Sequence, residues 1–129
     1  MRSSVARRVA RGLLAAGLLG MGTAHFRPGP ASTMAAMIPP TLRRHGLPSP
    51  AALVALTGTC ELAGGVGLLM PPTRRLAGAW VIAFLAAVFP ANAYAARDPE
   101  RFGAAAVPFW PRLGAQAALA ALTLWVSRG

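Results

Sequence analysis

Residues 51–70 read AALVALTGTCELAGGVGLLM, and this stretch decides the fold because it carries only one charged residue, Glu61. An α-helix rises 1.5 Å per residue, so twenty residues reach about 30 Å, the thickness of the hydrocarbon core of a bilayer. A carboxylate at that depth costs a few kcal/mol or more unless it is protonated, paired or facing water. The stretch therefore predicts a membrane-spanning helix, and Glu61 is the first candidate for a functional residue.

The composition of the chain favours the membrane class throughout. Hydrophobic residues make up 55% of the 129 residues and charged residues only 12%, about half of the ~25% that is usual in soluble proteins. The formal charge of +10 comes from arginines that lie in small groups between apolar segments, with no lysine. Arginines that flank membrane helices explain this distribution better than a nucleic-acid interface, which would interleave a dense basic stripe with aromatic residues. We therefore expect a lipid bilayer as the partner and no nucleic acid.

Four apolar segments divide the chain, at about residues 9–26, 51–70, 76–96 and 106–126. They predict a single domain of the all-α class, an integral membrane four-helix transmembrane bundle. The short turn at 71–75 makes the second and third helices an antiparallel hairpin. Four arginines before the first segment resemble a secretory signal, but residues 25–28 (His-Phe-Arg-Pro) lack a small-x-small cleavage site, so we expect a retained helix.

The proline-rich loop at 27–50 contains a candidate interfacial helix at Ser32–Ile38, with Met34 and Met37 beside Ile38 facing lipid. The arginine cluster before the first helix predicts that both chain ends lie on the cytoplasmic side. Small residues at four-residue spacing predict the faces on which helices meet. These residues are Gly12, Ala16, Gly20 and Ala24 in the first helix, Gly58 and Gly65 in the second, and Gly114 and Ala118 in the fourth.

Five polar residues fall in the middle-to-outer half of such a bundle: His25, Glu61, Asn92, Arg112 and Gln116. We interpret them as a candidate binding cluster in which Arg112 or His25 pairs with Glu61. Each also has a structural explanation: an ion pair that fixes helix register, a histidine at the headgroups, an arginine that reaches phosphate, or an amide between helices.

Three further residues have expected structural roles in the bundle. Pro90 should kink the third helix beside Asn92 and free the carbonyl of Ala86. Gly64 and Gly65 follow Glu61 and would allow close helix contact. The backbone at these positions would therefore shape the surroundings of the cluster.

The order of motifs resembles the DoxX and DoxX-like membrane proteins over roughly residues 12–126. The motifs are His25-Phe26, Ile38-Pro39-Pro40, Glu61-x-x-Gly64-Gly65, Pro71-x-x-Arg74-Arg75-Leu76-Ala77, Phe89-Pro90-Ala91-Asn92 and Arg112-Leu113-x-x-Gln116. Gly114 departs from the pattern, because relatives often carry proline after Arg-Leu. The resemblance implies a four-helix transmembrane bundle in the bacterial plasma membrane. It also implies, as for some members, an association with quinone-linked redox chemistry.

These observations leave three functions open. The first is an accessory subunit of a membrane redox system that binds quinone, with electrons from a protein partner. The second is a non-catalytic protein that binds a lipid or a partner subunit, and the third is a small proton-coupled exporter. Cys60 is the only cysteine and His45 lies in the loop, so we expect no thiolate or other metal site and no resident bis-histidine haem. Catalytic residues, if the chain has any, are not identifiable from the sequence.

Overall fold

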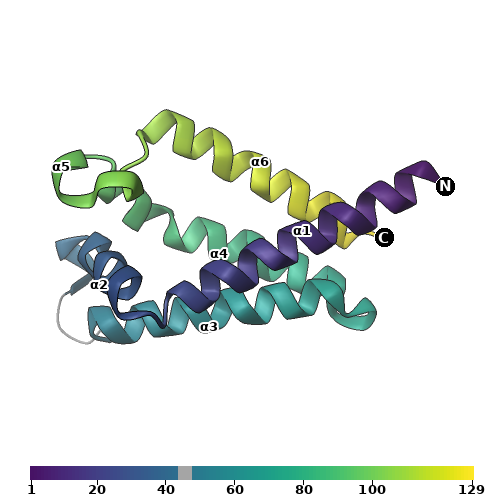
Figure 1. The fold of residues 1–129 in the computed structure, drawn as a ribbon, viewed down its shortest axis with the longest axis horizontal. Helices are drawn as coiled ribbons and strands as arrows, with labels where there is room; N and C mark the ends of the chain where they lie inside the picture. Colours follow the sequence, from purple (N-terminus) through teal and green to yellow (C-terminus); the bar gives the residue numbers. More distant parts are fainter. Residues whose placement is uncertain (44–47) are drawn as a thin grey trace.

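The structure is a computed structural model that describes residues 1–43 and 48–129, and in these ranges it contains helices and loops but no strand. The prediction of the all-α class is confirmed. Arg44 and His45 of the proline-rich loop lie outside the described residues. Four long helices run back and forth along one axis (Figure 1). They are α1 (Arg2–Ala24), α3 (Pro50–Leu69), α4 (Arg74–Ala95) and α6 (Phe109–Ser127).

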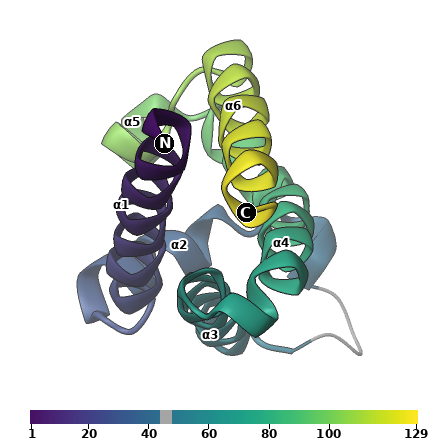
Figure 2. The same ribbon diagram turned by 90° about the vertical axis from the view of Figure 1, so that its right-hand side faces the viewer.

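Short elements connect the long helices at the two ends of the bundle. The α3–α4 turn contains η2 (Pro71–Thr73) and lies at the end that holds both termini, while α2 (Pro28–Met37) and α5 (Pro99–Phe102) lie at the opposite end (Figures 1 and 2). The 3-10 turns η1 (Pro40–Arg43) and η3 (Gly103–Ala105) complete these connections. The bundle therefore has a terminal end and a covered end, and these two names are used below.

Local sequence explains where the helices begin. Proline occupies the first turn of α2, α3 and α5, where its fixed φ fits the helix and its missing N–H is not needed. Ser49 caps α3 by accepting a hydrogen bond from the N–H of Ala52 at 3.2 Å. The first helix starts at Arg2, well before the apolar segment, because arginine is a good helix former and the exposed arginines remain solvated.

Glycines on two faces of α3 let both neighbouring helices approach closely. A Cβ added at Gly58 would lie 2.5 Å from the Cβ of His25, and one at Gly65 would lie 3.1 Å from Leu19, both in or next to α1. On the other face, a Cβ at Gly64 would lie 2.6 Å from Val81 of α4. Helix α3 is thus the central element, and its glycines set its distance from α1 and α4.

The small-residue face predicted for the first helix is wrong. A Cβ added at Gly12 or Gly20 would meet nothing within 4 Å, and Ala16 is exposed. The buried face of α1 instead consists of Arg11, Ala15, Leu18 and Gly22. The physical reason is Leu18, which packs with Leu68 and Val81 in a core cluster and so determines which side of α1 turns inward. The predicted pair in the fourth helix, Gly114 and Ala118, is likewise exposed.

The segment between α1 and α3 does not present its apolar residues outward as expected. Met37 and Ile38 are buried, and Met34 is half-buried. Met37 packs with Ala95 and Phe102 in a second core cluster, because α2 folds over the end of the bundle against α3 and α4. This cluster joins α2, α4 and α5 into one layer that covers the end of the bundle remote from the termini.

Two helices of the described chain are long and apolar enough to cross a membrane, Pro50–Leu69 and the stretch Pro71–Ala95 that includes α4. Only 33% and 17% of their most apolar windows are buried inside the molecule. Most residues in these windows are therefore at least partly exposed.

Candidate functional site

His25 and Glu61 lie against each other between α1 and α3. Nδ1 of His25 is 3.5 Å from Oε2 of Glu61, and each side chain is only 10% exposed. His25 directly follows the last turn of α1, and Gly58 sits one turn before Glu61, so the missing side chain of Gly58 leaves the space that His25 occupies. The contact therefore depends on the glycine as much as on the two ionisable residues.

The orientation of the His25 ring is set by its own helix. Nδ1 is 2.8 Å from the carbonyl oxygen of Met21, one turn earlier. A carbonyl oxygen only accepts, so Nδ1 carries the proton and donates it, and Nε2 of the neutral ring holds the lone pair. The same Nδ1–H also faces Oε2 of Glu61, so the ring lies between the Met21 carbonyl and the Glu61 carboxyl group in an otherwise apolar part of the bundle.

Gln116 links α6 to α4 beside the proline of α4. Its Nε2 donates a hydrogen bond to the carbonyl oxygen of Leu85. Leu85 directly precedes Ala86 in α4. Pro90 has no N–H, so it was expected to leave the carbonyl oxygen of Ala86 without its helical hydrogen bond. The side chain of Gln116 thus bridges two helices near the site of the expected kink.

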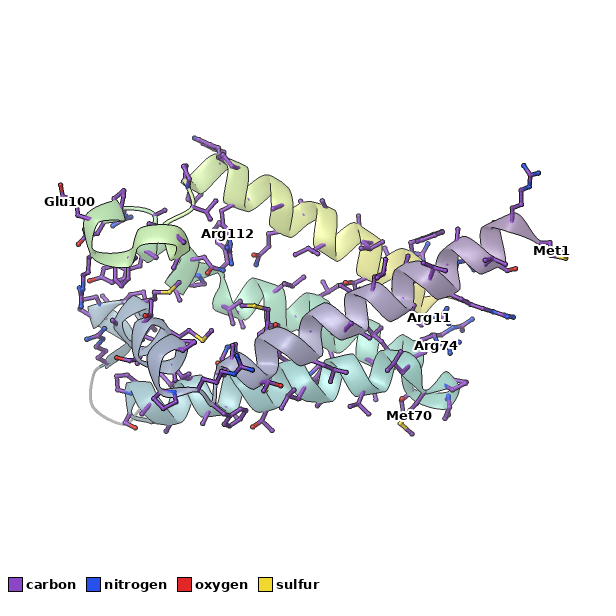
Figure 3. The ribbon with its side chains drawn as sticks, in the orientation of Figure 1. Met1, Arg11, Met70, Arg74, Glu100 and Arg112 are labelled. Atoms are coloured by element: carbon purple, nitrogen blue, oxygen red, sulfur yellow. The ribbon has the colours of Figure 1, made fainter. Side chains whose placement is uncertain are left out.

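Asn92 and Arg112 lie further toward the covered end. Asn92 is 8% exposed and, within residues 1–43 and 48–129, its side chain makes no hydrogen bond. Arg112 is half-buried in the first turn of α6, and Figure 3 shows its side chain directed from α6 toward α4. Both residues place hydrogen-bond donors on the inner side of the bundle.

Of the five predicted residues, the structure joins His25 to Glu61 and Gln116 to the backbone of α4. Glu61 pairs with His25, and no ion pair between Glu61 and Arg112 occurs among the described residues. Of the two partners expected for Glu61, the structure shows His25, which follows the end of α1 and faces the middle of α3. The side chain of Gln116 is hydrogen-bonded to the backbone of α4 and, within the described chain, to none of the other four residues.

Three buried polar residues of the described chain were missed from the sequence, Arg11, Thr123 and Ser127, and Arg11 is the charged one. Arg11 is 7% exposed, and its Nε donates to the carbonyl oxygen of Val126 at 2.9 Å, so α1 is tied to the end of α6. A second hydrogen bond runs from Arg11 to the carbonyl of Gly129. Arg74 donates to that same carbonyl at 2.9 Å, and Figure 3 shows both arginines at the terminal end. The sequence pattern that could have identified Arg11 is its position four residues before Ala15 and seven before Leu18, which places it on the buried face of α1.

The described ranges contain no group of three or more histidine, cysteine or acidic side chains that could hold a metal ion.

Comparison with known proteins yields one family. The sequence profile of a domain of unknown function, DUF8561, matches residues 14–127. No curated protein matches the chain significantly, and no solved structure does so either.

Proposed function

The chain belongs to the DUF8561 family, whose domain has no known function, and from its own geometry we propose that it is an integral membrane four-helix bundle that binds quinone as an accessory subunit of a membrane redox system. The single observation that carries the binding site is the buried contact of His25 with Glu61 between α1 and α3 in an otherwise apolar bundle. The link to redox chemistry comes from the resemblance to DoxX-like proteins.

The membrane placement is supported by the outer surface of all four long helices. Large apolar side chains are exposed on each of them, and a soluble monomer rarely exposes so much contiguous apolar surface. In lipid the same surface is solvated. The exposed residues include Val9, Leu13 and Met21 of α1, Leu56, Val66 and Leu69 of α3, Leu76 and Trp80 of α4, and Leu113, Leu119 and Leu124 of α6.

Arginines at the two ends of the bundle support an orientation with the terminal end in the cytoplasm of a bacterium. Seven arginines flank the terminal end, against five described ones at the covered end, and the dense group before the first apolar segment has the strongest influence on topology. The seven are Arg2, Arg7, Arg8, Arg11, Arg74, Arg75 and Arg128. The polar cluster then lies in the outer half of the bilayer.

The chemistry of the cluster suits a ligand with carbonyl oxygens. Asn92 and Arg112 offer N–H donors, and hydrogen bonds from a charged donor are about twice as strong as neutral ones. The His25–Glu61 pair supplies or accepts the proton that accompanies reduction or oxidation of a quinone. Electrons come from a protein partner, and the bundle holds the quinone head in place and exchanges its protons.

Ligand-dependent thermal stability tests this proposal directly. The purified protein in lipid nanodiscs should unfold at a higher temperature when a short-chain ubiquinone is added, since a ligand at 100 times its Kd stabilises by about 2.7 kcal/mol. Asn92→Leu and Glu61→Gln should reduce the shift. Thr59→Val is the matched control because Thr59 is exposed on α3, two residues from Glu61. No shift in the wild type, or equal shifts in all variants, would overturn quinone binding.

Electron transfer provides the second test. Membranes that contain the protein and its redox partner should lose quinone-dependent oxidation when His25 or Glu61 is replaced by alanine, because the proton-exchanging pair is removed. Thr59→Val should leave the rate unchanged. Unchanged oxidation in His25→Ala and Glu61→Ala membranes would exclude a role of the pair in this chemistry.

The close contact of His25 with Gly58 favours a second candidate function. The protein would then be a non-catalytic bundle in which the His25–Glu61 pair only fixes the packing of α1 on α3. In that case Glu61→Gln should lower thermal stability and any cellular function in parallel. A fully stable Glu61→Gln protein that has lost its function would exclude the structural role.

A further inference from the structure

The outer side of the seam between α4 and α6 carries a groove with an apolar length and a basic end. The groove has a volume of about 850 Å³, which is in the range of small-molecule sites (~300–1,000 Å³). Its apolar lining consists of Ala79, Ile82, Ala83, Ala86 and Leu124. Small residues on α4 keep the groove open, while Gly78 brings the backbones of α4 and α6 together behind it, since a Cβ there would lie 2.5 Å from Ser127.

The groove runs into a second, smaller hollow at the terminal end of the bundle. This hollow has a volume of about 200 Å³ and shares Arg75, Ser127 and Arg128 with the groove. Arg74 and Pro71 line it as well. The apolar groove therefore opens onto a hollow lined by Arg75, Arg128 and Arg74. The guanidinium group of Arg74 donates a hydrogen bond to Gly129, which also lines the hollow.

Arg75 and Arg128 are the two arginines of this hollow whose side chains remain available to a ligand. Arg75 and Arg128 are exposed and make no ion pair or side-chain hydrogen bond within the described part of the chain. The three acidic residues of the sequence are elsewhere: Glu61 lies in the middle of α3, and Asp98 and Glu100 lie at the covered end. The pocket is thus complementary to an anion that comes from outside the molecule.

The length of the groove matches one leaflet of a bilayer. Eleven residues of α4 separate Arg75 from Ala86, which is about 16 Å at 1.5 Å per residue. Half of a ~30 Å hydrocarbon core is about 15 Å. A chain that fills the groove would therefore start at the headgroup level, where Arg75 and Arg128 lie, and end near the bilayer midplane.

We propose that the groove between α4 and α6 binds an anionic phospholipid, with its phosphate between Arg75 and Arg128 and an acyl chain along Ala79, Ala83 and Ala86. The site is distinct from the polar cluster, because none of the five cluster residues, all of them in the described ranges, lines the groove. It rests on the membrane placement proposed above but not on quinone binding. In the proposed orientation the site faces the cytoplasmic leaflet, which is rich in anionic lipids.

Spin-labelled lipids test the headgroup specificity. The full chain is reconstituted into phosphatidylcholine bilayers with a trace of spin-labelled phosphatidylglycerol or spin-labelled phosphatidylcholine, and the immobilised fraction gives the relative affinity. Phosphatidylglycerol should be preferred in the wild type. Arg75→Gln with Arg128→Gln should reduce the preference by about 30-fold, since each basic group near the surface contributes a factor of about five. Arg97→Gln with Arg101→Gln, exposed at the covered end, is the control and should leave the preference intact.

Filling the groove tests the acyl-chain half of the proposal. Ala86→Phe places a ring in the groove and should lower the immobilised fraction of phosphatidylglycerol, whereas Ala87→Phe, exposed next to it but outside the groove lining, should not. Equal behaviour of these two variants would overturn the groove site. So would equal immobilisation of the two phospholipids, or stronger binding of spin-labelled stearate than of phosphatidylglycerol, which would identify a free fatty acid as occupant.

Failure of the lipid site and failure of the membrane placement give different results. A protein that floats with the vesicles and resists carbonate extraction is inserted, and absence of lipid preference then overturns the lipid site alone. A protein that does not insert into the bilayer overturns both the membrane placement and the lipid site.

Discussion

The His25–Glu61 contact places two ionisable side chains, each 10% exposed, at 3.5 Å from each other. Two residues in contact in an apolar setting show coupling energies of about 0.5–3 kcal/mol in double-mutant cycles. We expect His25→Ala and Glu61→Gln to couple within this range when the free energy of unfolding is measured in detergent or nanodiscs. The coupling should be favourable, because either single variant leaves the other group without its partner.

The control for this cycle is Thr59→Val on the same helix. Its hydroxyl donates to the carbonyl of Ala55 in its own helix at 2.8 Å and is exposed, so its change should add to that of His25→Ala without coupling. Coupling of Thr59 equal to that of Glu61 would show that the measured energy reflects general disruption of α3 and not the pair.

Arg11 makes a second residue-scale prediction. Its guanidinium holds the carbonyl of Val126 at 2.9 Å, and hydrogen bonds to charged groups contribute about 1.5–3 kcal/mol. Arg11→Met keeps most of the length of the side chain but removes the donors, so it should lower the free energy of unfolding by about this amount. Arg8→Met, one turn earlier and exposed, should have almost no effect in the same unfolding measurement. Equal losses would point to net charge as the cause.

At the scale of elements, the glycines of α3 control how closely α1 approaches. A Cβ at Gly58 would lie 2.5 Å from His25 Cβ and 3.0 Å from the ring of Phe26. Gly58→Ala should therefore destabilise by about 1–3 kcal/mol, the usual cost of overpacking, and should shift the His25 ring away from Glu61. Thermal unfolding gives the first effect, and the NMR signals of the His25 imidazole report the second.

The matched control is Gly20→Ala in α1, where an added Cβ meets nothing within 4 Å. Alanine in an exposed helix position is more favourable than glycine by about 0.5–1 kcal/mol, so this variant should be neutral or slightly more stable. A loss of stability in Gly20→Ala would indicate that the exposed face of α1 packs on something outside this chain.

These elements also show how far sequence reasoning reaches. Apolar length predicted four long helices, and a long helix is found near each of the four segments. Two of these helices are long and apolar enough to cross a membrane. The inward face of α1 could not be predicted from small residues alone. Its rotation about the helix axis is set by Leu18 and Arg11, which meet partners from α3, α4 and α6 that are distant in sequence.

The residues of the candidate site could be selected from the sequence, but the contacts between them could not. The cost of a lone carboxylate in an apolar helix singled out Glu61, and helix rise placed His25, Asn92, Arg112 and Gln116 at similar depth. Depth does not determine which side chains touch, because that depends on helix rotation and on the tilt of α6 away from α1 near the covered end (Figure 1). The choice between His25 and Arg112 as partner needed the structure.

For the whole molecule, α4 runs along the bundle and so places Arg75, in its first turn, and Arg101, in α5 beyond its end, at opposite ends. In a Cys60→Ser background, which has no other cysteine, Arg101→Cys should react with a membrane-impermeant maleimide from outside intact cells. Arg75→Cys should react only after the cells are made permeable. The measurement is the labelled fraction of each variant on a gel.

Labelling of both positions from the same side would contradict the spanning orientation of α4. Labelling of Arg75→Cys alone from outside would retain the bundle but reverse it, and the polar cluster would then lie in the cytoplasmic half of the membrane. A cysteine at Leu119, exposed in the middle of α6, is a control that should stay unlabelled in both conditions.

The hydrogen bond from Arg11 to Val126 spans 115 residues of chain, and this separation has a consequence for biosynthesis. A ribosome that adds about 5–20 residues per second needs roughly 6–23 seconds to cover that distance. Throughout this interval the guanidinium of the first helix lacks the acceptor that the last helix provides. The nascent protein therefore completes its terminal end only after α6 has been synthesised, and until then Arg11 lacks the carbonyl acceptor that holds it in the finished molecule.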